Sequence, residues 1–292
     1  MIYVIDFILR TLRHLAHIII PRGASPEVYR RWMRALYRFL VYDSKTMTVR
    51  VRRGLLVGCK KYGPFIESDF DFALGRYEPE VRDALCEICH PGMTVFDVGA
   101  HAGYITLLLS KLVGETGNVH AFEPITRNIP YLLETFRINN LHNIIIPPVA
   151  ISDVVGAAQI SCGGIFDGCA TLMAESHGHY RDKTSIKISV KTITLDKYCV
   201  DAGISHVDLV KMDIEGAEML ALAGMSKILS FQHRPFLIVE FWGRRNVVEG
   251  TELLHRSGYK IKVLSAWSGV VDNNLVDIQT VLGVPAVYNM AN

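Results

Sequence analysis

From about residue 80 onward, short apolar runs alternate with longer amphipathic stretches. Short runs rich in Val, Ile and Phe are typical of buried strands, and the amphipathic stretches between them are typical of surface helices. The predicted strands cover residues 94–98, 118–122, 144–149, 207–212, 236–241, 259–264 and 278–282. The predicted helices cover residues 79–89, 103–113, 126–138, 217–229 and 247–256. This alternation predicts an α/β fold in which crossover helices connect the strands of a parallel sheet.

Residues from about 155 to 195 interrupt this rhythm. A glycine-rich stretch, SCGGIFDGCATL, is followed by SIKISVKTITL, in which polar and apolar residues alternate. Such alternation is typical of a half-buried strand. We therefore expect a β-rich insertion here, placed where it could overhang a site on the main sheet.

The first 53 residues have a different pattern. Within residues 3–20, the polar residues Asp6, Arg10, Arg13, His14 and His17 share one face of a predicted helix. Ser25 and Pro26 suit the start of a second helix, whose arginines lie on one side. We therefore divide the chain into a basic amphipathic helical extension, residues 1–53, and a main domain, residues 54–292.

Charge is distributed unevenly between these two parts. Residues 1–53 hold eleven Lys and Arg against three acids, whereas the remainder holds twenty against twenty-six. Such an asymmetry suggests an anionic partner, for example a membrane surface on which the two helices lie. The alternative is that their apolar faces cover the main domain or pair with a second copy of the chain in a homo-oligomer.

Composition and targeting signals narrow the setting. Half of the 292 residues are hydrophobic, which excludes a disordered chain and allows a sizeable core. Asp6, Arg10 and Arg13 interrupt the apolar start, so we expect neither a secretory signal nor a spanning helix. Six cysteines without such a signal favour a reducing compartment. We expect a cytoplasmic protein, with peripheral membrane attachment as the alternative.

The stretch VFDVGAHAGYITLLL, residues 95–109, predicts a buried strand, a glycine turn and a helix. Gly99 and Gly103 allow the backbone to approach a ligand at the free N–H groups of the helix. Asp97 would repel pyrophosphate but suits a cation such as the sulfonium of S-adenosylmethionine. Glu123 ends the next strand, where an acid can accept hydrogen bonds from both ribose hydroxyls. Together these residues favour an adenosine ligand without phosphates.

A second group of acids lies at the ends of the predicted strands VDLVKM and LIVEF. Asp213, Glu215 and Glu240 would meet at the carboxyl edge of the sheet, where open α/β sheets place reactive groups. They could act as a general base toward an alcohol or jointly bind Mg²⁺, and we slightly favour the metal-free site and assign no metal ligand. Glu218 is interpreted as a helix-start residue. Lys211 could pair with one of the three acids, although we favour a lysine whose stem leaves the sheet.

Several segments together resemble a known family. GRYEPEVRDALCEICHPGMTVFDVGAHAGYITLLLSKLVGETGNVHAFEPITRN, INNLHNI, VAISD, TLD, VDLVKMDIEGAEMLALAGM and FLIVEF are similar to the FkbM-type class I S-adenosylmethionine-dependent methyltransferases. The resemblance covers roughly residues 75–245. It implies a Rossmann-like, seven-stranded, mostly parallel sheet with helices on both faces and an antiparallel last strand. It also implies methyl transfer mostly to hydroxyl oxygens of sugars and polyketides.

The resemblance also implies roles for particular residues. Tyr77 and Glu78 would border the cofactor, and its methionine end would be held by Asp97, Gly99, Ala100, His101 and Gly103. Glu123 would bind its ribose, and Ala150 and Asp153 would flank its adenine. His101 departs from the family, which usually has asparagine at this position.

We therefore expect an S-adenosylmethionine-dependent O-methyltransferase acting on a hydroxyl of a saccharide, glycolipid or other natural product. One alternative is a nucleic-acid N-methyltransferase, which we disfavour because the acceptor-holding motif N-P-P-Y is missing. The other alternative is a non-catalytic subunit that binds the cofactor or serves as a scaffold.

Overall fold

A computed structural model describes residues 38, 41–66, 68–162, 186–230, 233–271 and 274–286. The chain forms two compact units, Met1–Tyr77 and Glu78–Asn292, which we describe separately. The two predicted N-terminal helices lie almost entirely outside the described residues, so they stay a prediction. No helix in the described ranges has both the length and the apolar character needed to cross a membrane.

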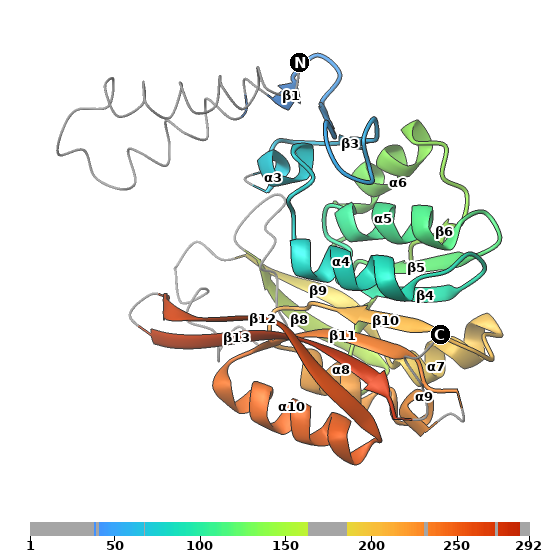
Figure 1. The fold of residues 1–292 in the computed structure, drawn as a ribbon, viewed down its shortest axis with the longest axis vertical. Helices are drawn as coiled ribbons and strands as arrows, with labels where there is room; N and C mark the ends of the chain where they lie inside the picture. Colours follow the sequence, from blue (N-terminus) through green and yellow to red (C-terminus); the bar gives the residue numbers. More distant parts are fainter. Residues whose placement is uncertain are drawn as a thin grey trace. The chain divides into compact units, whose positions relative to one another are not determined.

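The larger unit is built on a seven-stranded sheet (Figure 1). Its strands in spatial order are β12 (Tyr259–Val271), β13 (Asn274–Pro285), β11 (Phe236–Trp242), β10 (Leu209–Met212), β4 (Thr94–Val98), β5 (Asn118–Phe122) and β6 (Ile144–Ile145). Neighbours from β11 to β6 run parallel, and β13 runs antiparallel to both β11 and β12. The predicted Rossmann-like fold with one antiparallel strand is confirmed.

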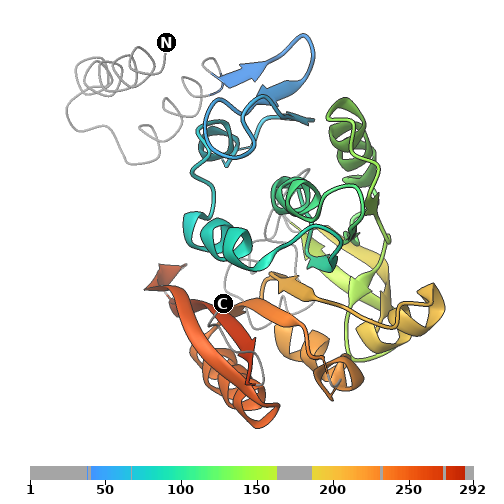
Figure 2. The same ribbon diagram turned by 45° about the vertical axis from the view of Figure 1, so that its right-hand side comes forward.

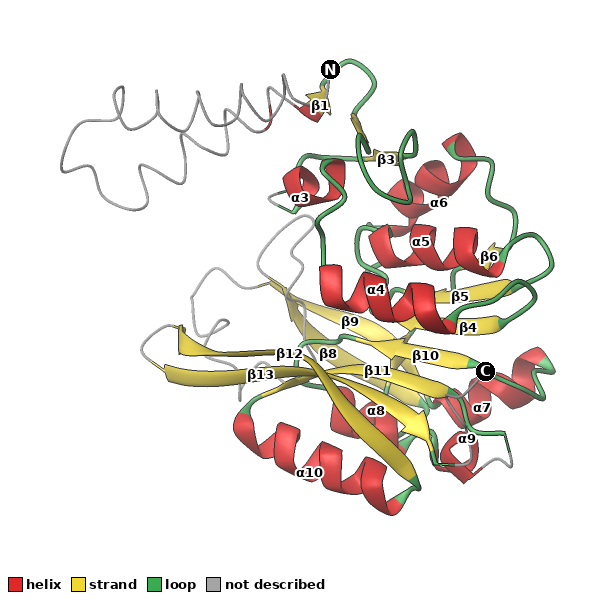
Figure 3. Cartoon of the chain, in the orientation of Figure 1, coloured by secondary structure: helices red, strands yellow, loops and turns green. Residues whose placement is uncertain are grey.

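Helices cover both faces of this sheet (Figures 1 and 3). One face carries α4 (Pro79–Ile88), α5 (Tyr104–Val113) and α6 (Ile129–Ile138). The other carries α7 (Leu195–Ala202), α8 (Glu218–Ala223), α9 (Ser226–Ser230) and α10 (Arg244–Arg256). Because both faces are covered, β10 is buried at all four positions, as expected for the centre of a parallel sheet. Its carboxyl end is therefore held rigidly between β4 and β11.

A second, three-stranded sheet in the larger unit corresponds to the predicted β-rich insertion. It contains β7 (Ala150–Ile151), β9 (Ile186–Ile193) and β8 (Gly156–Cys162) in that order. Residues 163–185, between β8 and β9, lie outside the described residues. The insertion is thus β-rich where the structure describes it, and its predicted position over the site stays a prediction.

Three element predictions were wrong in detail. The predicted strand 144–149 ends early, because Pro147 and Pro148 cannot donate to a ladder. The predicted helix 217–229 is divided into α8 and α9 around Gly224, which packs so closely that an added Cβ would lie 2.1 Å from the Ser152 carbonyl oxygen. Helix α7 was missed, although Thr194 caps it by accepting a hydrogen bond from the Lys197 N–H.

The smaller unit contains β1 (Tyr42–Asp43), β2 (Thr48–Arg50) and β3 (Lys60–Tyr62) in one antiparallel sheet, followed by α3 (Asp69–Ala73). The Arg52 N–H donates to the Ala73 carbonyl, so residues beyond 53 pack together with the residues before them. The unit boundary at Tyr77 therefore lies later than the division after residue 53 that the charge pattern suggested.

The contact between α10 and the sheet gives a test of the fold. Gly250 faces Phe241, and an added Cβ would lie 2.3 Å from the Phe241 ring. Alanine is the better helix former by about 1 kcal/mol, but overpacking a core costs about 1–3 kcal/mol. We expect Gly250→Ala to lower the free energy of unfolding in urea by up to about 2 kcal/mol, the overpacking cost less the gain in helix propensity. Gly156→Ala, whose Cβ would meet Thr192 at 3.9 Å, is the matched control and should change it by less than about 0.5 kcal/mol.

Candidate functional site

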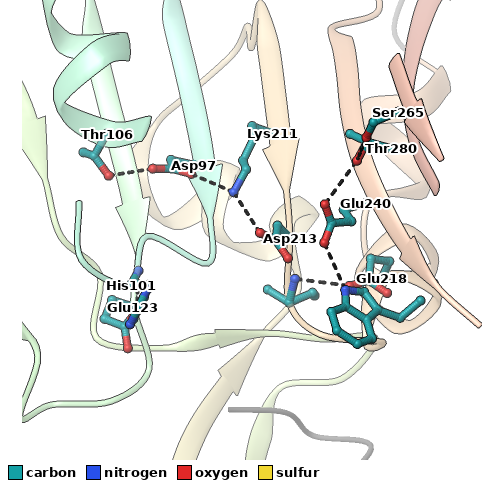
Figure 4. A network of polar contacts seen from close by, with 12 residues as sticks. Asp97, His101, Thr106, Glu123, Lys211, Asp213, Glu218, Glu240, Ser265 and Thr280 are labelled. Carbon is teal, nitrogen blue, oxygen red and sulfur yellow. Dashed lines mark hydrogen bonds and ion pairs between the residues drawn. The ribbon is translucent and has the colours of Figure 1, made fainter. Parts of the chain in front are cut away.

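Three acids lie at the carboxyl ends of neighbouring strands, around one lysine (Figure 4). Asp97 belongs to β4, Asp213 follows β10, and Glu240 belongs to β11. The Lys211 Nζ lies 3.5 Å from Asp213 Oδ2 and 4.0 Å from Asp97 Oδ1. The structure therefore brings together three of the acids that the sequence assigned to two separate roles.

Lys211 is buried, with a 5% exposed side chain. Burial lowers the pKa of its ammonium group, but the charges of Asp213, Glu78, Asp97 and Glu240 act against burial and raise that pKa overall. The favoured interpretation of Lys211 as a lysine whose stem leaves the sheet was wrong, and the alternative, that it pairs with one of the acids, is confirmed by its contact with Asp213. The lysine is a fixed positive charge at the centre of the acidic cluster, and the four carboxyl groups outnumber it.

Glu240 is held at both carboxylate oxygens. Its Oε1 accepts a hydrogen bond from Trp242 Nε1 at 3.1 Å, and its Oε2 accepts one from Thr280 Oγ1 at 3.1 Å. Ser265 Oγ donates in turn to Thr280 at 3.0 Å (Figure 4). Burial, together with the nearby charge of Asp213, raises the pKa of Glu240 to about 8. A proton thus binds to this carboxyl near neutral pH, which is the range suited to acid–base chemistry.

Asp97 has no exposed surface, and burial raises the pKa of its carboxyl group. Thr106, in the first turn of α5, donates a hydrogen bond to Asp97 Oδ2 at 2.5 Å. The other oxygen, Oδ1, is buried without a hydrogen-bond partner, and so is Asp213 Oδ1. Two buried carboxylate oxygens without donors are expensive, so they point to a ligand that supplies a cation or donors.

The glycine turn after β4 has a packing reason that the sequence did not reveal. Gly99 has φ +93°, and an added Cβ would lie 2.0 Å from the Asp213 carbonyl oxygen. Its small size therefore lets the turn after β4 approach the turn after β10. His101 also has a left-handed backbone, at φ +45°, a conformation that asparagine and histidine adopt more readily than most residues.

Glu123 joins two loops. It accepts hydrogen bonds from the His101 N–H at 2.8 Å, the Ile125 N–H at 3.0 Å and Asn128 Nδ2 at 3.0 Å. Burial raises the pKa of its carboxyl group to about 7. These bonds use three of about four acceptor positions of a carboxylate. Binding of ribose hydroxyls stays a prediction, and the structure adds the role of holding the turn that contains His101.

Glu218 begins α8, as predicted, and it also shapes the loop before it. Its Oε1 accepts hydrogen bonds from the Ile214 N–H at 3.1 Å and the Gly216 N–H at 2.9 Å. Burial raises the pKa of this carboxyl group to about 7. Glu215 lies within the loop and has a left-handed backbone, at φ +56°. The loop that carries Asp213 and Glu215 is thus held by the buried carboxyl of Glu218.

A small apolar pocket of about 30 Å³, partly open to solvent, lies at the ends of β4, β5 and β7. Its lining residues are Val98, Gly99, Phe122, Pro124, Val149, Ala150, Ile151, Ile160, Ile214 and Ala217. Ala150 lines this pocket, and its predicted place beside the adenine stays a prediction. Asp153 is exposed and accepts a hydrogen bond from Ser152 Oγ, outside this lining.

The remaining predicted residues are placed as follows. Ala100 is buried beside Gly99, and Gly103 precedes α5 with φ +81°. Glu78 precedes α4 with a left-handed backbone, at φ +40°. Tyr77 belongs to the smaller unit, so its predicted place at the cofactor stays a prediction.

Sequence reasoning missed the polar residues that hold the acids, and it raised a metal that the structure does not support. Thr106, Thr280, Trp242 and the central role of Lys211 were not predicted. Only Thr106 had a signal, because it lies in the first turn of the helix that follows Asp97. Among the described residues, no group of three or more His, Cys, Asp or Glu side chains is arranged to hold a metal ion.

The mostly parallel sheet with antiparallel β13, ending in an acidic edge beside an apolar pocket, defines the class of Rossmann-like methyltransferases. Residues 97–261 match the family model described as the methyltransferase FkbM domain, which covers more than half of the chain. The chain belongs to this family of S-adenosylmethionine-dependent methyltransferases.

Individual relatives share little sequence identity with this chain. The 31-O-demethyl-FK506 methyltransferase FkbM of Streptomyces tacrolimicus is 27% identical over 165 residues, which are 46% of this chain. The alignment spans 60% of that relative's length. The solved structure of a methyltransferase FkbM from Methylobacillus flagellatus is 13% identical, covers 88% of this chain and 60% of that chain, and has a TM-score of 0.45. The solved structure of an S-adenosylmethionine-dependent O-methyltransferase from Thermotoga maritima is 13% identical, covers 84% of this chain and 79% of that chain, and has a TM-score of 0.42.

The buried carboxyl of Glu218 predicts a pH-dependent stability. Its pKa rises from 4.5 to about 7 on folding, so the folded state keeps a proton that the unfolded state loses. Its contribution to stability is therefore present below pH 4.5 and is lost as pH rises through about 7. Glutamine keeps the acceptor oxygen but cannot ionise. We expect Glu218→Gln to match the wild type at acid pH and to be more stable by up to about 3 kcal/mol at about pH 8.

Urea unfolding across this pH range measures the difference. Glu252→Gln is the control, because Glu252 is a largely exposed carboxyl on α10. A constant difference between Glu218→Gln and the wild type at every pH would contradict the raised pKa.

Proposed function

We propose that this protein transfers the methyl group of S-adenosylmethionine to a hydroxyl oxygen of a saccharide, glycolipid or other natural product. The observation that carries the proposal is the pair Asp213 and Glu240 beside Lys211, at the edge of the sheet where reactive groups of open α/β folds lie. Such a pair can receive the proton that an alcohol must lose when its oxygen is methylated.

The residues present fit the methyl donor. The positively charged methionine end of S-adenosylmethionine suits the acidic cluster. There, Glu78, Asp97, Asp213 and Glu240 surround a single lysine. Asp97 Oδ1 and Asp213 Oδ1, both buried without hydrogen-bond partners, can accept from an ammonium group. The apolar residues that line the pocket next to Gly99 are of the kind that packs against an adenine ring, and the pocket of about 30 Å³ must widen to admit one. When bound, the methyl donor supplies an activated methyl group and an excellent leaving group.

The protein contributes alignment and proton removal. Methyl transfer is an in-line displacement, so the acceptor oxygen must lie opposite the sulfur. Holding it there is worth several kcal/mol of barrier, and a well-placed base adds about 10²- to 10⁴-fold in rate. Glu240 is the base we favour, because its pKa of about 8 makes its carboxylate a stronger proton acceptor than an ordinary glutamate. Lys211 and Thr280 position the acids rather than react.

The acceptor class rests on weaker support. The curated relative is named for methylation of an oxygen of a demethylated FK506. A hydroxyl acceptor also agrees with a site whose groups remove protons. Nucleic-acid N-methylation and a non-catalytic scaffold are the competing functions, and turnover on acceptor panels separates them. A cytoplasmic location, pairing with a second copy and binding of residues 1–53 to an anionic membrane stay predictions.

The charge of the site gives a test of cofactor binding that needs no acceptor. Glu240 has a pKa of about 8, so below that pH a cationic ligand must displace its proton. Affinity for S-adenosylmethionine should therefore increase with pH up to about 8, by at most about tenfold per pH unit. S-adenosylhomocysteine lacks the sulfonium charge and should depend on pH much less.

Calorimetric titration of both ligands over this pH range measures the effect. Glu240→Gln should make the affinities of S-adenosylmethionine and S-adenosylhomocysteine depend on pH in the same way. Glu249→Gln, on the surface of α10, should leave the difference between the two ligands unchanged. Equal pH dependence for the two ligands in the wild type would contradict the placement of the sulfonium next to Glu240.

Turnover tests the reaction. The protein is incubated with methyl-labelled S-adenosylmethionine and separate panels of saccharides and glycolipids, amines, and RNA. We expect label in base-stable methyl ethers of the hydroxyl panel. With the best acceptor, Glu240→Gln should lower kcat by about 10²- to 10⁴-fold while the variant still binds the cofactor. Asp213→Asn should weaken cofactor binding as well, because Asp213 is proposed to hold the ammonium group of the methyl donor. Label in RNA or amines supports the N-methyl alternative, and tight cofactor binding without any transfer supports the scaffold.

A further inference from the structure

One face of the hairpin in the smaller unit, opposite its buried side, is basic. Strand β2 continues as an extended segment in which Val49 and Val51 are buried and Arg50 and Arg52 are exposed. Lys60 on β3 lies directly opposite Arg50. Opposite residues of an antiparallel pair share a face, so Arg50, Arg52 and Lys60 form one cationic surface.

Two exposed cations of this surface, Arg50 and Arg52, have no anionic partner within the unit. In the part of the chain that the structure describes, no ion pair includes either of them. An anion from outside the unit would therefore complement their charge.

Two aliphatic side chains project from the end of the same hairpin. Leu55 and Val57 are each 62% exposed, whereas Leu56 between them is 3% exposed. Gly54 and Gly58 flank the three residues with left-handed backbones, at φ +79° and +89°. The turn Gly54–Gly58 therefore buries one apolar side chain as an anchor and presents the other two to solvent.

The hairpin is firmly attached on its inner face. Lys61 forms a buried ion pair with Asp69 of α3, with both Asp69 oxygens 2.7 Å from the Lys61 ammonium. The Arg52 N–H donates to the Ala73 carbonyl, and an added Cβ on Gly75 would lie 2.4 Å from the Arg53 carbonyl oxygen. Leu55 and Val57 are therefore exposed on a structured turn (blue in Figure 2) and not on a loose end.

We propose that this hairpin, residues 50–60, docks on an anionic lipid bilayer. Leu55 and Val57 enter the interfacial region, and Arg50, Arg52 and Lys60 lie against the lipid phosphates. Aliphatic side chains next to basic ones match such an interface, in which apolar burial and charge attraction add. A nucleic acid would match the basic face, but Leu55 and Val57 offer it neither stacking nor hydrogen bonds. The proposal does not depend on the methyl-transfer reaction.

Vesicle binding of the full chain tests the contribution of the turn. Vesicles of phosphatidylcholine with phosphatidylserine are compared with phosphatidylcholine alone. We expect Leu55→Ser with Val57→Ser to lower partitioning to the anionic vesicles by at least about tenfold. Val154→Ser with Val155→Ser is the matched control, because these two residues are 58% and 62% exposed in the larger unit. Equal losses for the two pairs would overturn the proposal.

The basic face is tested separately. Arg50→Gln and Arg52→Gln should each lower partitioning about fivefold on anionic vesicles, and added salt should reduce the difference. Neither change should alter the weak binding to phosphatidylcholine alone. If these variants bind anionic vesicles like the wild type but lose binding to RNA, the surface serves a nucleic acid and the lipid proposal fails.

A local probe locates the contact, because residues 1–37 also belong to the full chain and could bind vesicles. Val57→Trp is compared with Val154→Trp, and quenching of the three native tryptophans in the wild type is subtracted. We expect brominated lipids in anionic vesicles to quench Trp at position 57 and not at 154. Circular dichroism and thermal melting show that the variants fold. No added quenching at position 57 in a folded, vesicle-bound protein would overturn the proposal.

Discussion

A buried ammonium group at the centre of the sheet organises the site. Lys211 belongs to β10, which lies between β4 and β11, so acids at the ends of these neighbouring strands converge on it. A buried charge without partners would cost several kcal/mol, and the acids remove that cost. Burial, together with the charges of the neighbouring acids, raises the pKa of Glu240, and because the acids outnumber the lysine the cluster favours a further cation. The same interaction thus stabilises the sheet and prepares the site for a cationic ligand.

Two other buried carboxyl groups hold backbone in place. Glu123 accepts from the turn after β4, and Glu218 accepts from the loop after β10. Gly99 lets these two segments touch, since its missing Cβ leaves room for the Asp213 carbonyl. The acids at the carboxyl edge therefore divide into a group that shapes the loops and a group that faces the ligand. Residue type alone does not distinguish the two groups of acids, but their hydrogen-bond partners do.

The two units use lysine and carboxylate pairs in different ways. Lys61 and Asp69 form a one-to-one buried pair that attaches the hairpin to α3, and its charges balance. Lys211 is surrounded by an excess of acids, so its charges do not balance. In the described part of the smaller unit the unbalanced charge lies on the exposed residues Arg50 and Arg52. Unbalanced charge, on Arg50 and Arg52 in the smaller unit and around Lys211 in the larger one, marks the proposed ligand surface in each unit, and balanced charge marks the structural contact.

The sequence by itself determined the strand–helix alternation, the glycine turn after β4, the acids at the strand ends and the family. These follow from local periodicity and from motifs that are continuous along the chain, so they need no knowledge of distant contacts. Only the tertiary structure decided that α8 and α9 are separate, since Gly224 packs on Ser152, and that Thr280 and Trp242 hold Glu240. It also decided that Lys211 is buried among acids, because strand order brings residues more than a hundred positions apart, such as Asp97 and Lys211, to one edge. Electrostatic environment depends on these spatial neighbours, and periodicity along a single chain contains no information about them.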